Sequence, residues 1–169
     1  MTASDTIRAR LEAVRAHMRA RALDALIVPR ADEYLGEYIP PHNERLRWIS
    51  GFTGSAGVVV VLPEAAAIFV DGRYTVQVRQ QVAAELFEYR HLVDEPHAHW
   101  LATRLERGAR VGYDPRMHTL TWQKKTTDTL ARRGVELVAL EQNIVDLCWH
   151  DRPQAGRHPA ILMEQRYTG

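Results

Sequence analysis

The sequence has few of the features that mark secreted or membrane proteins. It holds a single cysteine, Cys148, in 169 residues, so no disulfide can form within the chain and a reducing compartment is expected. Residues 1–18 lack the apolar core of a signal peptide. No apolar run approaches the roughly 20 residues that a membrane-spanning helix requires. We therefore expect a cytoplasmic protein with no membrane partner.

An excess of charge is also missing. The chain carries 22 basic and 21 acidic residues, which makes a formal net charge of +1. No strong electrostatic field would draw nucleic acid to it, so we expect no nucleic-acid partner. With 46% hydrophobic and 25% charged residues, the composition is that of an ordinary globular protein, and the length favours one domain.

Several motifs of known chemistry are absent as well. The sequence contains no P-loop, no Gly-x-Ser-x-Gly elbow and no zincin helix. His97 and His99 have the spacing of a metal pair, but no nearby Cys, Asp or Glu completes a ligand set, so surface histidines are expected. Cys148 precedes Trp149 in an apolar segment without an activating partner, which favours a buried structural thiol over a nucleophile.

The clearest positive pattern is a pair of continuous apolar segments. Residues 58–61 and 66–70 are separated by a short turn, which predicts a β-hairpin covered on both faces. The spaced glycines Gly51, Gly54 and Gly57 precede this hairpin. A dinucleotide-binding turn follows a strand and opens a helix, so these glycines predict turn geometry and no phosphate site.

A helix is predicted over residues 5–22, with Ser4 or Asp5 as its cap. Its apolar stripe consists of Ile7, Leu11, Val14 and Met18. We expect further helices over 43–49, 74–84, 95–108 and 119–133, and strands over 25–28, 86–93, 110–114 and 135–140. Residues 74–84 also alternate like a strand; a helix is preferred because it would cover the sheet.

These elements together predict an α/β fold, with a mixed sheet of about six strands and helices on both faces. In helix 119–133, the residues expected to face inward are Leu120, Trp122 and Leu130. Residues 30–47 are predicted to form a long surface loop, a kind of segment that often carries function. Residues 143–149 are apolar enough to dock on the body, and we expect a domain over 1–150 followed by a linker over 151–169.

The corner Asp71-Gly72-Arg73-Tyr74 places a polar cluster at the end of a buried strand. Structure alone could account for it, with Asp71 capping the next helix and Arg73 pairing with a carboxylate. In a functional interpretation, Arg73 offers its planar donor fork to a carboxylate or carbonyl of a ligand. The residues themselves leave both interpretations open.

Two motifs together closely resemble a known family. They are Arg-Leu-x-Trp-Ile-Ser-Gly-Phe-Thr-Gly-Ser-Ala-Gly at 45–57 and Asp-Gly-Arg-Tyr at 71–74. The stretch 42–82 resembles the N-terminal domain of cytosolic-type Xaa-Pro aminopeptidases, which belongs to the creatinase/prolidase N-terminal family. The weaker order of elements continues over 5–140. This resemblance implies a creatinase/prolidase-like fold with ribonuclease H-like layering.

Family members remove the N-terminal residue from peptides whose second residue is proline, and they use two divalent metals, commonly manganese. Their metal ligands lie in a C-terminal catalytic domain. The resemblance therefore implies that this chain holds no metal ligand, is not catalytic alone and is continued by further domains. It also implies that the domain shapes the access of proline-containing peptides to the active site and contributes to contacts in a homo-oligomer, such as a dimer.

Among single residues, the resemblance implies that Arg73 faces the substrate channel, together with Asp71 and Tyr74 of the same motif. The segment 42–47, with His42 and Arg45, is a further candidate for lining the channel or a dimer contact. Two alternatives stay open. The chain could be the N-terminal domain of a prolidase or creatinase-like hydrolase, or it could be a stand-alone interaction module.

Overall fold

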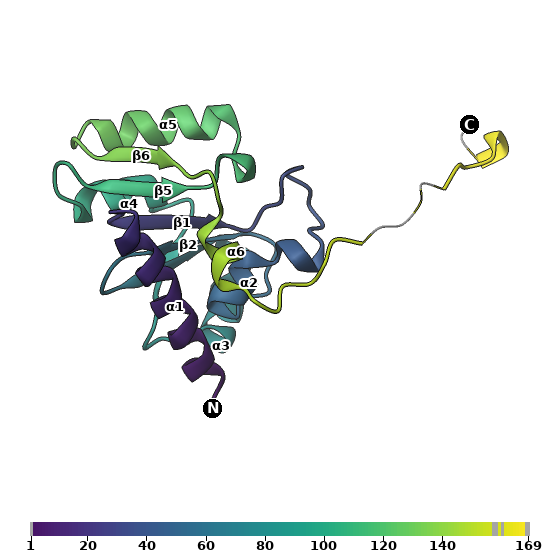
Figure 1. Cartoon of the computed structure of the whole chain (residues 1–169), viewed down its shortest axis with the longest axis horizontal. Coiled ribbons are helices and arrows are strands. Elements are labelled where there is room, and N and C mark those ends of the chain that lie inside the picture. Colours follow the sequence, from purple (N-terminus) through teal and green to yellow (C-terminus); the bar gives the residue numbers. More distant parts are fainter. Residues whose placement is uncertain (1, 157–158, 160, 168–169) are drawn as a thin grey trace.

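The protein is built on one six-stranded sheet, as seen in a computed structural model that describes residues 2–156, 159 and 161–167 (Figure 1). The strands are β1 (Ala25–Pro29), β2 (Gly57–Val61), β3 (Ala66–Val70), β4 (Glu88–His91), β5 (Arg110–Tyr113) and β6 (Glu136–Ala139). They lie in the order β4-β3-β2-β1-β5-β6, and β2 runs antiparallel to both of its neighbours. The predicted α/β fold with a mixed sheet of about six strands is confirmed.

The β2–β3 hairpin is the most deeply buried part of the sheet. Val58 pairs with Phe69, and the backbone N–H of Leu62 donates to the carbonyl of Ala65 at 2.8 Å, which closes the turn. Every residue of β3 is buried, because helices cover both faces of the sheet there. The predicted hairpin is confirmed.

One face of the sheet is covered by α1 (Ala3–Ala20), α2 (Arg45–Ser50) and α6 (Ile144–Cys148), which contact one another. The predicted apolar stripe of α1 is buried. The predicted cap is wrong, since Thr2 is the N-cap: its hydroxyl accepts the backbone N–H of Asp5 at 3.1 Å, and Asp5 accepts that of Thr2 at 2.8 Å. This reciprocal capping box begins the helix earlier than its first apolar residue suggests.

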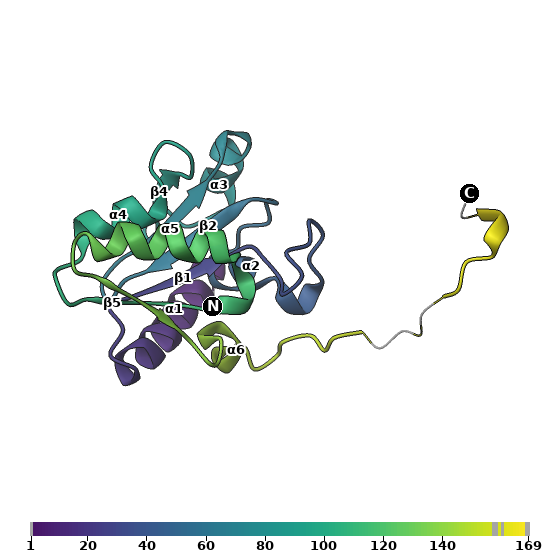
Figure 2. The ribbon, with the colours of Figure 1, turned by 90° about the horizontal axis from the view of Figure 1, so that it is seen from above.

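The opposite face is covered by α4 (His97–Arg104) and α5 (Leu120–Ala131), which lie together across the sheet (Figure 2). Leu130 is buried there as predicted, and Trp122 is half-buried against the same core. The prediction that Leu120 faces inward is wrong, because this side chain is 84% exposed. Thr119 caps the helix by accepting the N–H of Trp122, so Leu120 lies in the first turn, beyond the edge of the core.

The segment that could be either helix or strand is a helix. A short 3-10 turn, Gly72–Tyr74, leads into α3 (Thr75–Gln81), and Val78 is buried against the first layer. The following strand β4 then pairs in parallel with β3. A helical crossover of this kind is what two parallel neighbouring strands require.

Beyond α6 the chain leaves the domain (Figure 1). Residues 153–156 and 161–167 are exposed, and residues Gln165–Tyr167 form a single 3-10 turn. The division into a domain over 1–150 and a linker over 151–169 stays a prediction. Within the described ranges, no helix has the length and apolar character needed to cross a membrane.

Candidate functional site

Five strands place their carboxyl ends along one edge of the sheet. β1, β5 and β6 run parallel, β3 runs parallel to β4, and β2 reverses direction against both β1 and β3. In open α/β sheets, ligands bind at the carboxyl edge of the strands. The corner Asp71–Tyr74 directly follows β3, so it lies at the edge where a site is expected.

Asp71 and Arg73 form a bidentate ion pair at this edge. Arg73 Nε lies 3.1 Å from Asp71 Oδ1, and Nη2 lies 2.7 Å from Oδ2. Asp71 also accepts the backbone N–H of Arg73 at 2.9 Å and caps the 3-10 turn. The bonds from Arg73 hold the pKa of Asp71 below its usual value, so the pair is charged at neutral pH. The Arg73 side chain is nevertheless 68% exposed, which leaves it accessible to a ligand.

Tyr74 is tied to the glycine-rich loop that precedes β2. Its hydroxyl lies 2.6 Å from Ser55 Oγ, which lowers the pKa of Tyr74, and its ring meets Phe52 edge-on at 5.6 Å between centroids. A Cβ at Gly54 would lie 2.2 Å from Phe52 Cζ and 2.8 Å from Tyr74 Cδ1. Gly51 ends α2 with a φ of 80°. The glycines therefore serve turn geometry and close packing, as predicted.

The long loop after β1 is an ordered wall beside the corner. Arg30 Nη1 donates to the carbonyl oxygens of Glu37 at 3.0 Å and Ser55 at 3.2 Å. Asp32 is 4% exposed and accepts two backbone N–H groups of the loop, one of them from Gly36 at 2.9 Å. Sequence reasoning missed Arg30 and Asp32 because their hydrogen-bond partners are backbone groups. Asp32 with Gly36 four residues later was the available turn signal.

Arg45 lies inside the protein and joins α2 to α6. Its Nε and Nη2 donate to the two carboxylate oxygens of Asp146 at 2.7 and 2.9 Å, and its Nη1 donates to Asn43 Oδ1 at 2.9 Å. Arg152 approaches the same Asp146 carboxylate to 2.7 Å and donates to the carbonyl of His42 at 2.7 Å. Arg45 is 3% exposed, in contrast to the 68% exposed side chain of Arg73.

The reactive groups considered from the sequence form no site. Cys148 is buried, which raises the pKa of its thiol, as expected for a structural residue. His99 is exposed as predicted, but the prediction of a surface histidine is wrong for His97, which is 9% exposed. Across the described part of the chain, no three His, Cys, Asp or Glu side chains come together in a group that could hold a metal ion.

His97 belongs to an aromatic cluster between α4, α5 and the sheet. Its ring lies 5.9 Å from that of Trp122, and the ring of His118 stacks on Trp122 at 3.5 Å. Phe69 and Tyr113 contribute from the sheet. Burial lowers the pKa values of both histidines to about 4, so both are neutral at pH 7. The neighbours of His97 in the sequence do not indicate that rings from other elements bury it.

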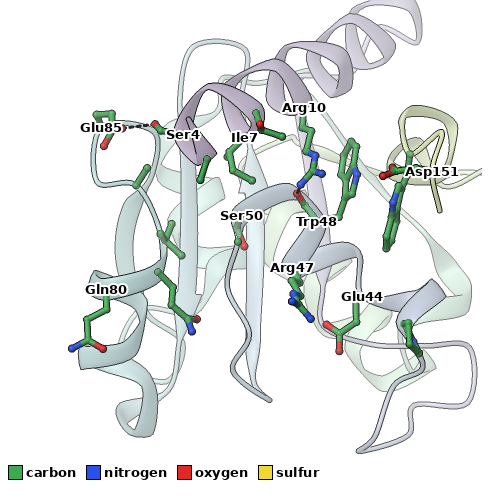
Figure 3. A pocket seen from close by; sticks show the side chains of 18 of the residues that line it. Ser4, Ile7, Arg10, Glu44, Arg47, Trp48, Ser50, Gln80, Glu85 and Asp151 are labelled. Carbon is green, nitrogen blue, oxygen red and sulfur yellow. Dashed lines mark hydrogen bonds between the residues drawn. The ribbon is translucent and has the colours of Figure 1, made fainter. Parts of the chain in front are cut away.

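A second concave region lies among α1, α2 and α3, and we call it the α1–α2–α3 groove (Figure 3). It encloses about 900 Å³. Its apolar lining residues are Ile7, Trp48, Val82 and Trp149. Trp48 stacks on Trp149 at 5.9 Å, and Arg10 donates to the carbonyl of Trp48 at 2.7 Å. Of the described residues that line this groove, Glu44 and Arg47 belong to the candidate segment 42–47, and none belongs to the corner Asp71–Tyr74.

Comparison with known proteins gives one family over most of the chain. The model of the Creatinase/Prolidase N-terminal domain matches residues 10–147. Human Xaa-Pro aminopeptidase 2 is 37% identical over 163 residues, which cover 94% of this chain but 24% of the human protein. A probable Xaa-Pro aminopeptidase P from Botryotinia fuckeliana is 38% identical over 164 residues, 95% of this chain and 25% of that protein. The chain thus spans about a quarter of the length of these curated relatives.

Solved structures agree with this assignment. The X-prolyl aminopeptidase of Caenorhabditis elegans, described as a cytosolic enzyme with a di-nuclear active site, superposes with a TM-score of 0.87 at 29% identity. The match covers 94% of this chain and 28% of that one. The N-terminal domain of the cytoplasmic peptidase PepQ of Mycobacterium tuberculosis superposes with a TM-score of 0.63 at 25% identity. That match covers 83% of this chain and 98% of the PepQ chain.

Proposed function

Because this chain belongs to the creatinase/prolidase N-terminal domain family, we propose that it is the non-catalytic N-terminal domain of an Xaa-Pro aminopeptidase. The observation that carries the proposal is the match of nearly the whole chain to about a quarter of Xaa-Pro aminopeptidases at 37–38% identity. The parent enzyme would remove the first residue from peptides with proline in second position. A prolidase or creatinase-like parent is less well supported, since the curated relatives described above carry the aminopeptidase name.

In this proposal, the corner contributes the wall of a substrate channel. Asp71 fixes one edge of the Arg73 guanidinium, and the exposed remainder can donate to a carbonyl or carboxylate of the peptide. Tyr74 holds the corner against the Ser55 loop, and His42 lies at the rim where Arg152 binds its carbonyl. We assign Arg45 a supporting role, because its donors are engaged inside the domain.

The hydrolytic chemistry would come from a C-terminal catalytic domain of the parent. Two divalent metals, commonly manganese in this family, would activate a bridging hydroxide there. The described residues of this chain offer no group of three or more metal-binding side chains. What the chain itself supplies is a rigid surface that orients the peptide and limits its access.

The remaining assignments follow from the same parent. Residues 151–169 would link this domain to the next one. The parent would be cytoplasmic, as the C. elegans relative is described to be, and would act as a homo-oligomer such as a dimer.

Activity measurements on the chain and on its parent test the proposal. The purified 169 residues should leave an Xaa-Pro-Xaa tripeptide intact even with added manganese, whereas the parent protein should cleave it. In the parent, Arg73→Ala should lower kcat/KM at least tenfold while the metal content stays unchanged, because one charge-assisted hydrogen bond to the substrate is lost. Turnover by the 169 residues alone, or an unchanged kcat/KM in the variant, would contradict the respective part of the proposal.

A further inference from the structure

The α1–α2–α3 groove contains acidic groups that all have partners. Glu85 accepts the hydroxyl of Ser4 at 2.5 Å and lies near the positive charge of Arg8. Glu44 pairs with Arg30 at 4.0 Å, and Asp151 lies near the charge of Arg10. Arg10 itself lies over the Trp48 ring, with its guanidinium carbon 4.8 Å from the ring centroid. The negative charges of the groove are therefore balanced from within the chain.

Arg47 is the exception among the charged groups of the groove. It lies on the exposed side of α2, and in the described part of the chain its side chain makes no hydrogen bond or ion pair. Figure 3 shows it in the middle of the groove, between Ser50 and Glu44. The groove thus presents one uncompensated positive charge, which favours an anionic ligand.

The floor beside Arg47 is apolar and aromatic. Ile7, Trp48 and Val82 lie there, each less than 9% exposed, and Trp149 stacks on Trp48. The volume of about 900 Å³ falls within the range of ligand pockets, roughly 300–1,000 Å³. An apolar floor with a single cation suits a ligand with an apolar body and one carboxylate.

The opposite wall carries an amide. Gln80 of α3 is exposed on the rim, and no hydrogen bond of its side chain occurs among the described residues. A primary amide both donates and accepts, so it can pair with the peptide groups of a bound backbone. An acyl chain offers no hydrogen-bonding group to this amide, whereas a peptide backbone does, so a peptide uses more of the groove.

We propose that the α1–α2–α3 groove binds the C-terminal end of an apolar peptide, with the terminal carboxylate on Arg47 and apolar side chains over Trp48 and Ile7. This site is separate from the corner around Arg73, because none of the described groove residues belongs to Asp71–Tyr74. It does not depend on the enzymatic role proposed for the parent protein.

Titration of the 169-residue chain with matched dipeptides tests this site. The probes are acetyl-Leu-Leu with a free carboxylate, its C-terminal amide, and unacetylated Leu-Leu amide, which carries only a positive charge. Tryptophan fluorescence reports on Trp48 and Trp149, and amide chemical shifts locate the binding. We expect the carboxylate form to bind at least tenfold more tightly than either amide, with shifts centred on Arg47, Gln80 and Val82.

Variants of exposed arginines make the test specific. Arg47→Gln should abolish the preference for the carboxylate, Arg47→Lys should keep part of it, and Arg47→Glu should shift the preference toward the cationic Leu-Leu amide. Arg132→Gln, at an exposed position in the C-cap of α5 on the other face, is the matched control and should bind like the unmodified chain.

Several outcomes would overturn the proposal. They are equal binding of acid and amide, an unchanged preference in Arg47→Gln, absence of binding at millimolar concentrations, and shifts centred on the carboxyl edge of the sheet. Tighter binding of decanoate than of the peptide acid would show that the groove takes lipid-like carboxylates and would overturn the peptide assignment.

Discussion

Two arginine–aspartate pairs in this domain have almost the same geometry and opposite surroundings. Arg73 and Asp71 are two residues apart and meet at the sheet edge, where Arg73 is 68% exposed. Arg45 and Asp146 are 101 residues apart and meet between α2 and α6, where the Arg45 side chain is 4% exposed. The first pair presents a donor to solvent, whereas the second consumes its donors to hold helices together. Exposure, and not bond geometry, separates an arginine that solvent can reach from one that is engaged inside the domain.

The largest expected effect comes from breaking the buried pair. Arg45→Ala should lower the free energy of unfolding by about 3 kcal/mol, because it removes a buried partner from Asp146 and leaves a polar void between α2 and α6. Urea unfolding of the 169-residue chain measures this. Arg73→Ala is the matched control and should leave the urea midpoint nearly unchanged, since exposed ion pairs contribute little. Equal losses of unfolding free energy in Arg45→Ala and Arg73→Ala would contradict the distinction between a buried and an exposed pair.

Protonation of His97 in acid creates a buried cation. Unlike the Arg45 guanidinium, the His97 ring has no carboxylate bound to its nitrogens. Both nitrogens of His97 lack a hydrogen-bond partner within the described residues, and its pKa falls from 6.5 to about 4 on burial. The unfolded chain therefore takes up this proton first as the pH falls. Stability is complete above pH 6.5 and declines between pH 6.5 and 4, by about 3 kcal/mol for His97 at about 1.4 kcal/mol per pH unit.

Urea midpoints recorded from pH 7 to pH 4 measure this decline. His97→Phe keeps an aromatic ring that cannot bind a proton, so it should remove the His97 part of the decline and leave the part due to His118, whose pKa is also lowered to about 4. His99→Gln at an exposed position should not change the profile. A profile that keeps its full slope in His97→Phe would refute the assignment to this histidine.

The smallest effect is expected at the exposed corner. Asp71→Ala removes the cap of the 3-10 turn and one half of the surface ion pair, which should cost about 1 kcal/mol. Thermal unfolding of the chain measures it. A loss as large as that of Arg45→Ala would mean that the corner is a structural junction and would weaken its proposed role in binding.

Much of the fold could be predicted because its signals are local. The stripe of α1 and the apolar runs of β2 and β3 follow from periodicity, and the corner Asp71–Arg73 is a contact between near neighbours in the chain. Leu120 was misassigned because periodicity gives the phase of a helix but not where its first turn lies relative to the core.

The parts that could not be predicted depend on long-range contacts. Arg45 became a candidate for lining the channel or a dimer contact through its place in a motif, whereas its ion pair with Asp146, from the far end of the domain, could not be predicted. His97 was taken for a surface residue because the rings that bury it, Phe69 and Trp122, lie on separate elements. The groove likewise combines residues of three helices with residues after α6, so no single segment of the sequence predicts it.

The contact of Arg152 with both Asp146 and the His42 carbonyl has a geometric consequence. Arg152 thereby fixes the backbone at the point where the chain leaves the domain. The direction of the chain at this point is set by α6 and by the turn that precedes α2. A truncation before Arg152, or Arg152→Ala, would remove both contacts, while the sheet and its helices stay folded. In Arg152→Ala the chain beyond this point would no longer have a fixed direction.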